Sequence, residues 1–468
     1  MPSFHIEQFG CRATQADGAA IERQLRGQGC SPADDPDAAD VVVLNTCTVT
    51  ASADAQARDA IRKIHAVNPN TRIIVTGCYA QRAPEELAGL PGVSHVVGNS
   101  HKSQISALLQ TIAPVAAQPN PEGSSEFIEI SQLPPYHAAP ILTGNIFELT
   151  DVLVAPVMGG EGNHTRPTLK IQDGCNSRCS FCVIPFVRGK SRSLPPQTVI
   201  AEIQRLADSG FREIVLSGIH LGAYGRDLTP RSDFLVLLQR ILDETPVERL
   251  RISSIEPMDV TQDLIDLFAS SDRIARHFHM PLQSASDRIL AAMHRWYRAG
   301  HYARRIELIQ ESLPNAAIGA DVITGFPGET ETDHETTLQF IEERKFTYLH
   351  VFSYSSRPGT KAASLPGKVP GHIIKRRARE LRALGDTKNA TFRDAQISRT
   401  LHTLTLHPSE ECSARGLTPA LTSNYLQVHL PAVLPANLFV NAKIIGTFAK
   451  ALLAESPILN AAELLPAL

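Results

Sequence analysis

The chain has 468 residues, of which 43% are hydrophobic and 20% are charged, and its formal net charge is −3. A chain of this length usually forms about three domains, and the composition is that of a globular protein able to bury large cores. The weakly negative charge excludes binding of nucleic acid through overall basicity, so such a partner would require a local basic patch.

The N-terminal sequence MPSFHIEQFGCRATQ lacks the basic and apolar regions of a secretory signal. Apolar runs such as residues 41–44 are far too short to span a bilayer. We therefore expect a cytoplasmic protein with no membrane contact. In that compartment the eight cysteines are thiols rather than disulfides, and clustered thiols in a large enzyme favour metal or redox chemistry.

The first predicted domain, residues 1–113, alternates short apolar strands with Ala-rich helical segments. Strands are expected at residues 3–9, 40–45, 72–76 and 94–97. This alternation predicts a parallel α/β sheet. The segment that follows, residues 114–160, is rich in proline and glycine and predicts a linker.

The central domain, residues 161–395, returns to strand–helix alternation. Six strands are expected at residues 168–172, 213–217, 249–254, 277–282, 318–324 and 348–353, most of them followed by a helix. Six such units predict a partial TIM-like (βα)6 barrel, although periodicity alone leaves a doubly wound open sheet as the alternative.

The last domain, residues 396–468, is rich in strand-like segments such as LHTLTLHP and NYLQVHLP. This pattern predicts a small β-barrel, and residues 451–468 suggest an apolar tail or a short helix. The chain as a whole is therefore expected to be of the α/β class, with a β-rich C-terminal domain.

Cys175, Cys179 and Cys182 form the motif CNSRCSFC directly after a predicted strand. Three thiolates in one loop can ligate three irons of a cubane iron–sulfur cluster and leave the fourth iron open to a cofactor or substrate. Structural zinc prefers four ligands, commonly from paired C-x2-C units, and His164 would have to supply the fourth from across the linker. The spacing therefore favours a catalytic cluster over zinc.

Cys11, Cys47 and Cys78 each follow a different predicted strand of the first domain. Loops after the carboxyl ends of parallel strands meet in one crevice, so these three cysteines should converge. A lone buried cysteine often packs as a small hydrophobe, but three at equivalent strand ends predict a second cluster. Cys30 and Cys412 fit neither set and are expected to be structural or exposed thiols.

The motif CNSRCSFC resembles the cluster-binding loop of the radical S-adenosylmethionine superfamily. Together with the cysteines of the first domain it resembles the methylthiotransferase family, and within it the bacterial enzymes that methylthiolate C2 of N6-threonylcarbamoyladenosine at position 37 of tRNA. The segments that carry the resemblance are NTCTVT, GCYAQ, LKIQDGCNSRCSFCVIP, EIVLSGIHLGAYG, RLRISSIEP, HFHMPLQS, ADVITGFPGET and HVFSYSSRPGTKAA, and they extend over residues 3–395.

The resemblance implies two [4Fe-4S] clusters with different roles. The cysteines of CNSRCSFC would hold the cluster that binds S-adenosylmethionine and cleaves it to a 5′-deoxyadenosyl radical. The cysteines of the first domain would hold the auxiliary cluster that carries the sulfur to be methylated and transferred. No catalytic residue is expected beyond the cluster ligands. The residues expected to contact S-adenosylmethionine are Phe181, Ser217, Gly218, Glu256, Gln283, Gly319 and Asp321.

A basic stretch of the central domain is the candidate RNA contact. Eleven lysines and arginines lie between Arg357 and Arg399, and only three acidic residues oppose them. Charge alone favours a solvated helix face, whereas the resemblance favours neutralisation of tRNA phosphates. The expected contacts are Lys375, Arg376, Arg377, Arg379 and Arg382. The TRAM-like C-terminal domain carries few basic residues.

The resemblance also implies partners: tRNA as substrate and an electron donor such as flavodoxin or ferredoxin. We expect the protein to be a monomer. Alternative substrates within the family are N6-isopentenyladenosine in tRNA and an aspartate of a ribosomal protein. Alternatives outside it are an electron-transfer or cluster-carrier protein, although ferredoxin-type clusters usually have four cysteines each, and an RNA-binding protein with structural zinc.

Overall fold

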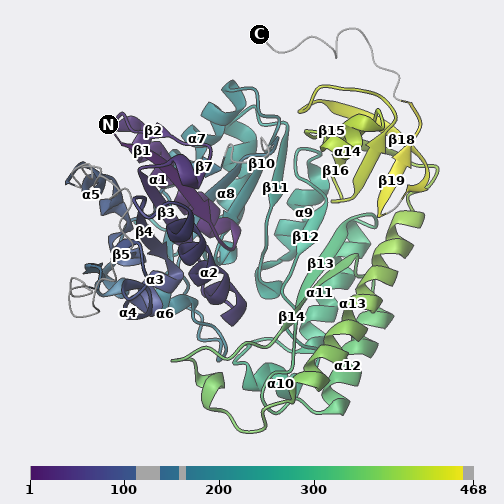
Figure 1. The fold of residues 1–468 in the computed structure, drawn as a ribbon. Helices are drawn as coiled ribbons and strands as arrows, with labels where there is room; N and C mark the ends of the chain where they lie inside the picture. The colour runs from purple at the N-terminus through teal and green to yellow at the C-terminus, as the bar shows by residue number, and fades with distance from the viewer. Residues whose placement is uncertain (1, 112–137, 158–164, 449, 457–468) are drawn as a thin grey trace, which may run out of the picture. The chain divides into compact units, whose positions relative to one another are not determined.

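The computed structural model describes residues 2–111, 138–157, 165–448 and 450–456 (Figure 1). The chain forms two compact units, one of residues 1–155 with 183–190 and one of residues 156–182 with 191–468. Within the described ranges, no helix combines the length and apolarity that crossing a lipid bilayer requires.

The first unit is built on a six-stranded parallel sheet with strand order β2-β1-β3-β4-β5-β6. Its strands are β1 (Ser3–Gln8), β2 (Ser31–Pro32), β3 (Val41–Thr46), β4 (Arg72–Gly77), β5 (Val93–Gly98) and β6 (Ile141–Leu142). Its helices are α1 (Arg12–Gly27), α2 (Ala51–Val67), α3 (Cys78–Arg82), α4 (Pro84–Ala88), α5 (Ile105–Thr111) and α6 (Ile184–Arg188). The parallel α/β sheet predicted from the sequence is confirmed.

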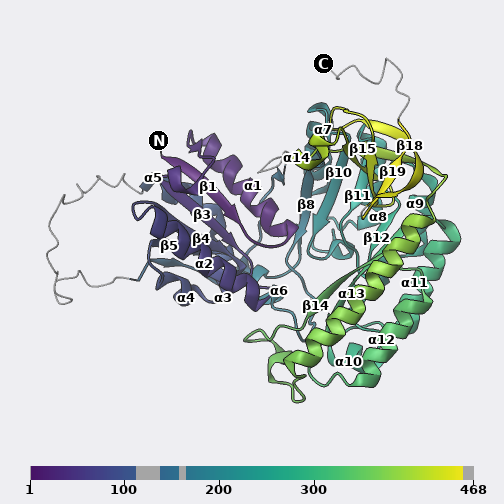
Figure 2. The ribbon, with the colours of Figure 1, turned by 45° about the vertical axis from the view of Figure 1, so that its right-hand side comes forward.

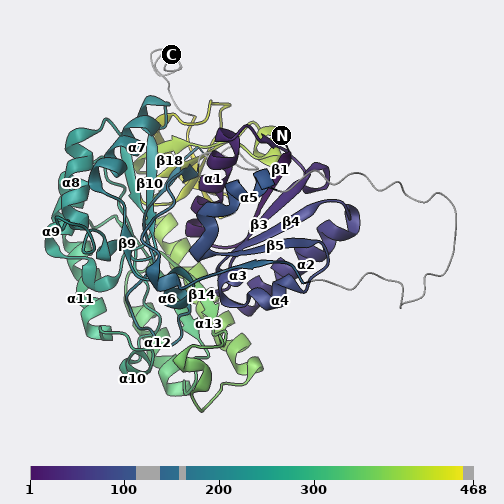
Figure 3. The ribbon, with the colours of Figure 1, turned by 90° about the vertical axis from the view of Figure 1, so that its left-hand side faces the viewer.

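Helices cover both faces of this sheet (Figure 3). Alternate residues of β3 point to opposite faces, as the pleat of a strand requires. Val42 packs in a core with α2 and α4, whereas Val43 packs in a core with α1 and α5. Both faces are therefore apolar, which explains why β3 begins with the uninterrupted hydrophobic run of residues 41–44. Strand β6 comes from the segment expected to be a linker.

The second unit contains six parallel strands, each close to its predicted range. They are β8 (Thr168–Asp173), β10 (Glu213–Gly218), β11 (Arg249–Ile252), β12 (His277–His279), β13 (Ala317–Thr324) and β14 (Tyr348–Ser353). Two short strands, β7 (Pro156–Val157) and β9 (Arg192–Ser193), pair antiparallel with β8. The accompanying helices are α7 (Pro196–Asp208), α8 (Phe234–Glu244), α9 (Gln262–Ser270), α10 (Asp287–Ala292), α11 (Ala299–Ser312), α12 (Glu331–Glu343) and α13 (Gly371–Asp394).

The order of these strands decides between the two folds left open by the sequence. Strands β8, β10 and β11 are neighbours in chain order, and so are β12, β13 and β14. A parallel bridge between Leu250 and Ile274 connects the two groups. Sequential order without a reversal is typical of a βα barrel, whereas a doubly wound sheet reverses its order at a switch point. The partial barrel is therefore confirmed.

The C-terminal region forms a closed barrel of strand order β15-β16-β17-β19-β18 (Figure 2). Its elements are β15 (Thr400–Thr405), α14 (Glu410–Ala414), β16 (Thr418–Thr422), β17 (Gln427–Leu430), β18 (Phe439–Phe448) and β19 (Ala451–Ala454). The expected tail or helix from Ala451 is wrong for β19, because Leu452 packs with Val428 and Ile444 in the barrel core. Residues 457–468 lie outside the described ranges.

Buried charges fasten this barrel to the amino ends of β10 and β11. Glu213 accepts hydrogen bonds from Arg251 Nε at 2.7 Å and from Arg249 Nη1 at 3.3 Å. Arg251 also donates to the backbone oxygens of Thr422 and Ser423, both at 3.0 Å. Because Arg251 donates both to Glu213 and to the C-terminal barrel, the two parts of this unit are held together by polar contacts as well as by packing.

Candidate active site and cluster-binding loops

The three cysteines of the first unit lie at the carboxyl ends of three adjacent strands, β1, β3 and β4. Cys11 precedes the first residue of α1, Cys47 follows β3, and Cys78 begins α3. The structure therefore places all three at one edge of the sheet, the edge where ligands bind in open α/β folds.

Two glycines allow the loops to approach one another here. Gly10 has φ +113°, and a Cβ at this position would lie 2.4 Å from Cβ of Cys47. Gly77 has φ +102°, and its Cβ would lie 2.3 Å from the backbone oxygen of Thr46. No larger residue fits either position without displacing the neighbouring strand end, so both glycines set the spacing of the cysteine loops.

The electrostatics of this edge suit a metal cluster. Burial, together with the neighbouring thiols of Cys78 and Cys11, raises the pKa of Cys47 to about 12. Nδ2 of Asn99 donates to Sγ of Cys78 at 3.5 Å. Cys47 and Cys78 are buried and Cys11 is exposed. Buried thiolates repel one another unless a cation lies between them, and a set of thiol donors is the ligand type that iron–sulfur clusters use. These residues therefore fit an iron–sulfur cluster.

A buried ion-pair network stands beside the same edge and was not predicted from the sequence. The carboxylate of Asp17 pairs with Nζ of Lys102 at 2.9 Å and with Nη2 of Arg188 at 3.1 Å. Nζ of Lys102 also donates to Oδ1 of Asn45, next to Thr46, at 3.2 Å. The positive charge of Arg188 acts to lower the pKa of Cys47, against the larger effect of burial.

The second cysteine set lies in the loop after β8. Gly174 has φ +69° and turns the chain into the loop, and the backbone N–H of Cys182 donates to the backbone oxygen of Cys179 at 3.1 Å. Ser180 anchors the loop, because its N–H donates to the backbone oxygen of Met293 at 3.0 Å and its hydroxyl donates to the backbone oxygen of Ala292 at 2.8 Å. Cys175, Cys179 and Cys182 are all partly exposed. Three thiols on an anchored, accessible loop fit a cluster with an open iron.

Two side chains not predicted from the sequence contact these thiols. Nδ1 of His220 lies 3.9 Å from Sγ of Cys175, and its Nε2 lies 2.9 Å from Oδ2 of Asp259. Burial opposes the charged form, but Asp259 and Cys175 raise the pKa of His220 to about 9. Nη1 of Arg295 donates to Sγ of Cys179 at 3.2 Å. Both contacts place positive charge beside a cysteine of this set, where it stabilises a thiolate.

Four of the residues expected to bind S-adenosylmethionine lie near the cysteine loop or at a neighbouring strand end. Phe181 packs against a core that includes Met293. Glu256 pairs with Arg295 and so reaches Cys179 indirectly. Ser217 is buried at the carboxyl end of β10. A Cβ at Gly218 would lie 2.8 Å from Cδ2 of Leu221, so a larger residue here would displace the end of that side chain.

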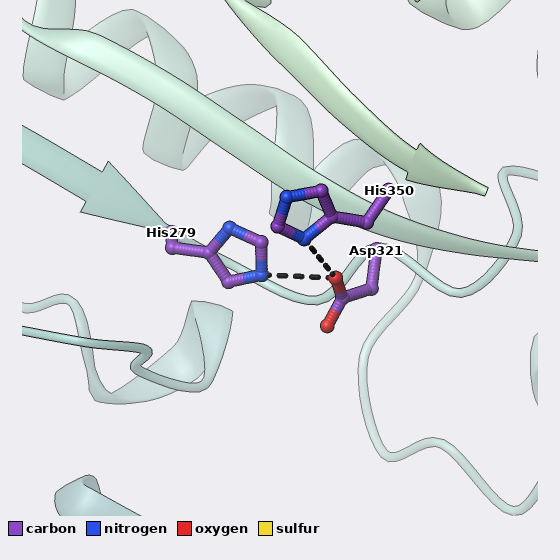
Figure 4. Close-up of side chains that lie close together, drawn as sticks. All are labelled: His279, Asp321 and His350. Carbon is purple, nitrogen blue, oxygen red and sulfur yellow. Dashed lines mark hydrogen bonds and ion pairs between the residues drawn. The ribbon is translucent and has the colours of Figure 1, made fainter. Parts of the chain in front are cut away.

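The other three lie on or beside β13. Gln283 has φ +63°, and its N–H donates to the backbone oxygen of Asp321 at 2.8 Å. Gly319 is needed for close approach rather than for a turn, because a Cβ there would lie 2.1 Å from Cζ of Tyr348. Oδ1 of Asp321 accepts from Nε2 of His279 at 3.0 Å and from Nδ1 of His350 at 3.2 Å (Figure 4).

The basic residues expected to contact RNA lie on α13 and differ in accessibility. Lys375, Arg379 and Arg382 are exposed. Arg376 is partly exposed and pairs with Glu331 and Glu380. The prediction that Arg377 contacts RNA is wrong, because Arg377 is buried and its Nη1 donates to Oε2 of Glu329 at 2.7 Å. A buried, paired guanidinium stabilises the packing of α13 and is not available to a phosphate.

Two protein families match the chain. Residues 3–98 match the family described as "Uncharacterized protein family UPF0004", and residues 169–341 match the Radical SAM superfamily. The first match contains the cysteines of the parallel sheet, and the second contains the cysteine loop after β8. The two matched segments therefore coincide with the two cysteine sets.

Curated relatives match over nearly the whole chain. The enzymes named threonylcarbamoyladenosine tRNA methylthiotransferase MtaB from Bacillus subtilis and Aquifex aeolicus are each 36% identical, over 91% and 90% of this chain and 89% and 95% of their own lengths. The tRNA-2-methylthio-N(6)-dimethylallyladenosine synthase of Syntrophobacter fumaroxidans is also 36% identical, over 81% of this chain and 79% of its own length.

A solved structure agrees on the fold. The radical S-adenosylmethionine methyltransferase TsrM from Kitasatospora setae superposes with a TM-score of 0.55 over 77% of this chain and 76% of its own, at 15% identity. At that identity the likeness bears on the fold alone. The family matches, the full-length relatives and the two cysteine sets lead to one conclusion: this chain belongs to the radical S-adenosylmethionine family of tRNA methylthiotransferases.

Proposed function

We propose that this enzyme transfers a methylthio group to C2 of N6-threonylcarbamoyladenosine at position 37 of tRNA. The observation that carries the proposal is the pair of three-cysteine sets, one in each unit, each placed by the carboxyl ends of parallel strands. The choice of adenosine is supported by the relatives named for threonylcarbamoyladenosine, which align over 91% and 90% of the chain.

The chemistry explains why cofactors are required. The C2–H bond of adenine is not acidic enough for a side-chain base, and general acid–base catalysis contributes only about 10²–10⁴-fold. When bound, two [4Fe-4S] clusters and S-adenosylmethionine supply the radical and the sulfur that no side chain can supply. The protein contributes position and charge: Cys175, Cys179 and Cys182 would hold one cluster, and Cys11, Cys47 and Cys78 would hold the other.

The chain's own residues prepare these positions. Ser180 anchors the loop of the second cysteine set to the carboxyl end of helix α10. His220 is held by Asp259 at 2.9 Å, so its ring presents Nδ1 to Cys175 in a fixed orientation. The guanidinium of Arg295 places a positive charge beside Sγ of Cys179. Such neighbours orient metal ligands and set the charge around them.

The proposed partners follow from the same assignment. We propose that the exposed side chains of Lys375, Arg379 and Arg382 contact tRNA phosphates. The radical reaction also requires an external electron, for which flavodoxin or ferredoxin is the proposed donor.

A second substrate is favoured by a specific observation. The dimethylallyladenosine enzyme of Syntrophobacter fumaroxidans is as identical to this chain, at 36%, as the threonylcarbamoyladenosine enzymes, although over a smaller share. N6-isopentenyladenosine is therefore the alternative substrate for the same chemistry.

The two substrates can be separated with purified protein. The anaerobically reconstituted enzyme is incubated with S-adenosylmethionine, a reductant and tRNA carrying either threonylcarbamoyl- or isopentenyl-adenosine at position 37. Mass spectrometry of the digested nucleosides should show a methylthio product from the first tRNA. A product from the second tRNA alone would show that isopentenyladenosine is the substrate. No product from either tRNA would refute tRNA methylthiolation.

A further inference from the structure

The inner face of β12, β13 and β14 carries a row of polar rings around one carboxylate. Phe278 stacks on Phe268 of the outer helix α9, with ring centroids 4.6 Å apart. Since neighbouring side chains of a strand point to opposite faces, His277 and His279 point inward. On β14, a Cβ added to Gly385 of α13 would lie 3.2 Å from Leu349, so Leu349 faces this helix.

By the same alternation, the residues of β14 on either side of Leu349 and every second residue from them face inward. Tyr348, His350 and Phe352 thus form one row that leads to the carboxyl end of the strand. The side chain of His350 is 55% exposed, and Phe352 is 45% exposed. Functional residues of βα barrels gather at the carboxyl ends of the strands, so this open end of the row is positioned to meet a substrate.

The polar groups of the row form hydrogen bonds with one another, and these bonds engage only one oxygen of Asp321. Nδ1 of His279 lies 3.0 Å from the hydroxyl of Tyr348, which also lies 2.7 Å from Nε2 of His277. Burial raises the pKa of Asp321, but hydrogen bonds from His279 and His350 outweigh it and hold the carboxyl well below its usual range. Asp321 is therefore an anion whose Oδ1 already accepts two hydrogen bonds (Figure 4).

The other side of this arrangement is open. No described residue forms a hydrogen bond with Oδ2 of Asp321 or with Nε2 of His350. A hydrocarbon group placed against these atoms would remove them from water without offering them new hydrogen bonds, which is costly. A ligand with N–H or O–H groups would offer such bonds. Sites built of such polar groups reject ligands that lack the matching groups far more strongly than apolar pockets reject extra polar ones.

We propose that Asp321 and His350 form the subsite that recognises the N6 substituent of the adenosine, and that Phe352 stacks on the base. This inference rests on the proposed function and extends it. The carbamoyl N–H and the hydroxyl of a threonylcarbamoyl group are donors to Oδ2 of Asp321 and partners for Nε2 of His350. An isopentenyl group has neither. An exposed aromatic ring at the end of the row is the type of platform on which proteins stack unpaired RNA bases.

This assignment differs from two others that the same residues allow. Asp321 was expected from the sequence to contact S-adenosylmethionine. The donor atoms of His279, Asp321 and His350 also lie within 4.8 Å of one another, so they could hold a metal ion. The proposed subsite accounts for the exposure of His350 and Phe352 on one face, which neither alternative requires.

The test is equilibrium binding by the reconstituted holoenzyme without reductant, so that no turnover occurs. Fluorescence anisotropy measures the affinity for anticodon stem-loops that carry threonylcarbamoyl-, isopentenyl- or unmodified adenosine at position 37. The variants are Asp321→Asn, His350→Ala and Phe352→Ala, and His301→Ala on the outer helix α11 is the matched control. S-adenosylmethionine binding and bound zinc are measured on the same samples.

We expect His350→Ala and Asp321→Asn to weaken binding of the threonylcarbamoyl stem-loop by about 10- to 100-fold, as loss of a hydrogen bond to a charged group does. Binding of the isopentenyl and unmodified stem-loops should change little. Phe352→Ala should weaken all three stem-loops alike, and His301→Ala should weaken none. Unchanged S-adenosylmethionine binding in each variant shows that the fold is retained.

Other results overturn the proposal. If His350→Ala weakened the binding of all three stem-loops equally, His350 would have no role in recognising the N6 substituent. Loss of S-adenosylmethionine binding in Asp321→Asn, with unchanged RNA affinities, would assign Asp321 to the cofactor. Zinc bound by the wild type and absent from Asp321→Asn would make the three residues a metal site. The proposed function fails separately, if the wild type modifies only isopentenyladenosine or neither tRNA.

Discussion

At the scale of single residues, each cysteine set accepts a hydrogen bond at a sulfur atom from a side-chain N–H group. Asn99 donates to Cys78, and Arg295 donates to Cys179. Hydrogen bonds and charges around cluster ligands orient them and alter the reduction potential of the cluster. The two sets differ in this respect, because the donor at Cys78 is neutral and the donor at Cys179 is charged. This difference fits two clusters with different tasks.

The two sets can be separated by substitution. Cys47→Ser should remove the auxiliary cluster and with it about half of the bound iron. The variant should still cleave S-adenosylmethionine to 5′-deoxyadenosine, because the other cysteines are intact, but it should form no methylthio nucleoside. Iron analysis and chromatography of the products check this. Cys30→Ser is the control, since Cys30 is buried in the core beside α1 and belongs to neither set; a Cys47→Ser protein that keeps full iron and full activity would contradict the assignment.

At the scale of elements, buried charges fix how strands and helices meet. Glu213 is fully buried on β10. Burial disfavours its charge, but Arg251 and Arg166 outweigh this effect and lower its pKa to about 2. Arg251 also connects β11 to the C-terminal barrel. Because the carboxylate compensates several buried guanidinium groups, its loss leaves them without a counter-charge.

Glu213→Gln should therefore destabilise the protein by about 3–5 kcal/mol at neutral pH, the cost of breaking a buried pair. The folded pKa of about 2 lies below the ordinary value of 4.5, so the stabilisation is present above pH 4.5 and is lost as the pH falls towards 2. Thermal unfolding should show a lower melting temperature for the variant than for the wild type. The difference between the two melting temperatures should narrow below about pH 4.5. A difference that widened in acid would contradict this account.

The basic residues of helix α13 fall into two groups: Arg377 is buried, whereas Lys375, Arg379 and Arg382 are exposed. Replacing Lys375, Arg379 and Arg382 with alanine should weaken tRNA binding and reduce its dependence on salt, by about 0.7–0.9 in log–log slope for each phosphate that is no longer neutralised. The fold should be retained, because these side chains are exposed. Arg377→Ala should instead lower the melting temperature. Lys345→Ala, on an exposed loop residue, is the control, and an unchanged salt slope in the triple variant would exclude α13 from the RNA interface.

At the scale of the whole molecule, the sequence predicted the features that follow general rules of chain geometry. The convergence of Cys11, Cys47 and Cys78 at one sheet edge could be predicted, because parallel strands place their carboxyl ends together. The six βα units could be predicted from their periodicity. Strand β19 could not, since the short apolar run at Ala451 fits a strand and a helix equally well.

The residues that the sequence did not reveal, or that it placed wrongly, differ in the physical reason. Asp17 meets Lys102 and Arg188, which are 85 and 171 positions away along the chain, and no local pattern reports a pairing at that distance. Arg377 was expected at the surface because basic residues of a helix are usually solvated. Only His220 had a signal in the sequence, since it lies two residues beyond Gly218, at the carboxyl end of a barrel strand.

Nucleoside mass spectrometry of tRNA from cells with and without the gene tests the proposed methylthiolation of N6-threonylcarbamoyladenosine. We expect 2-methylthio-N6-threonylcarbamoyladenosine to disappear without the gene while its unmethylthiolated precursor remains. The wild-type gene should restore it, and a Cys47→Ser copy should not. Loss of a methylthio-isopentenyl nucleoside instead would contradict the substrate, and an unchanged set of tRNA methylthio nucleosides would contradict the tRNA reaction itself.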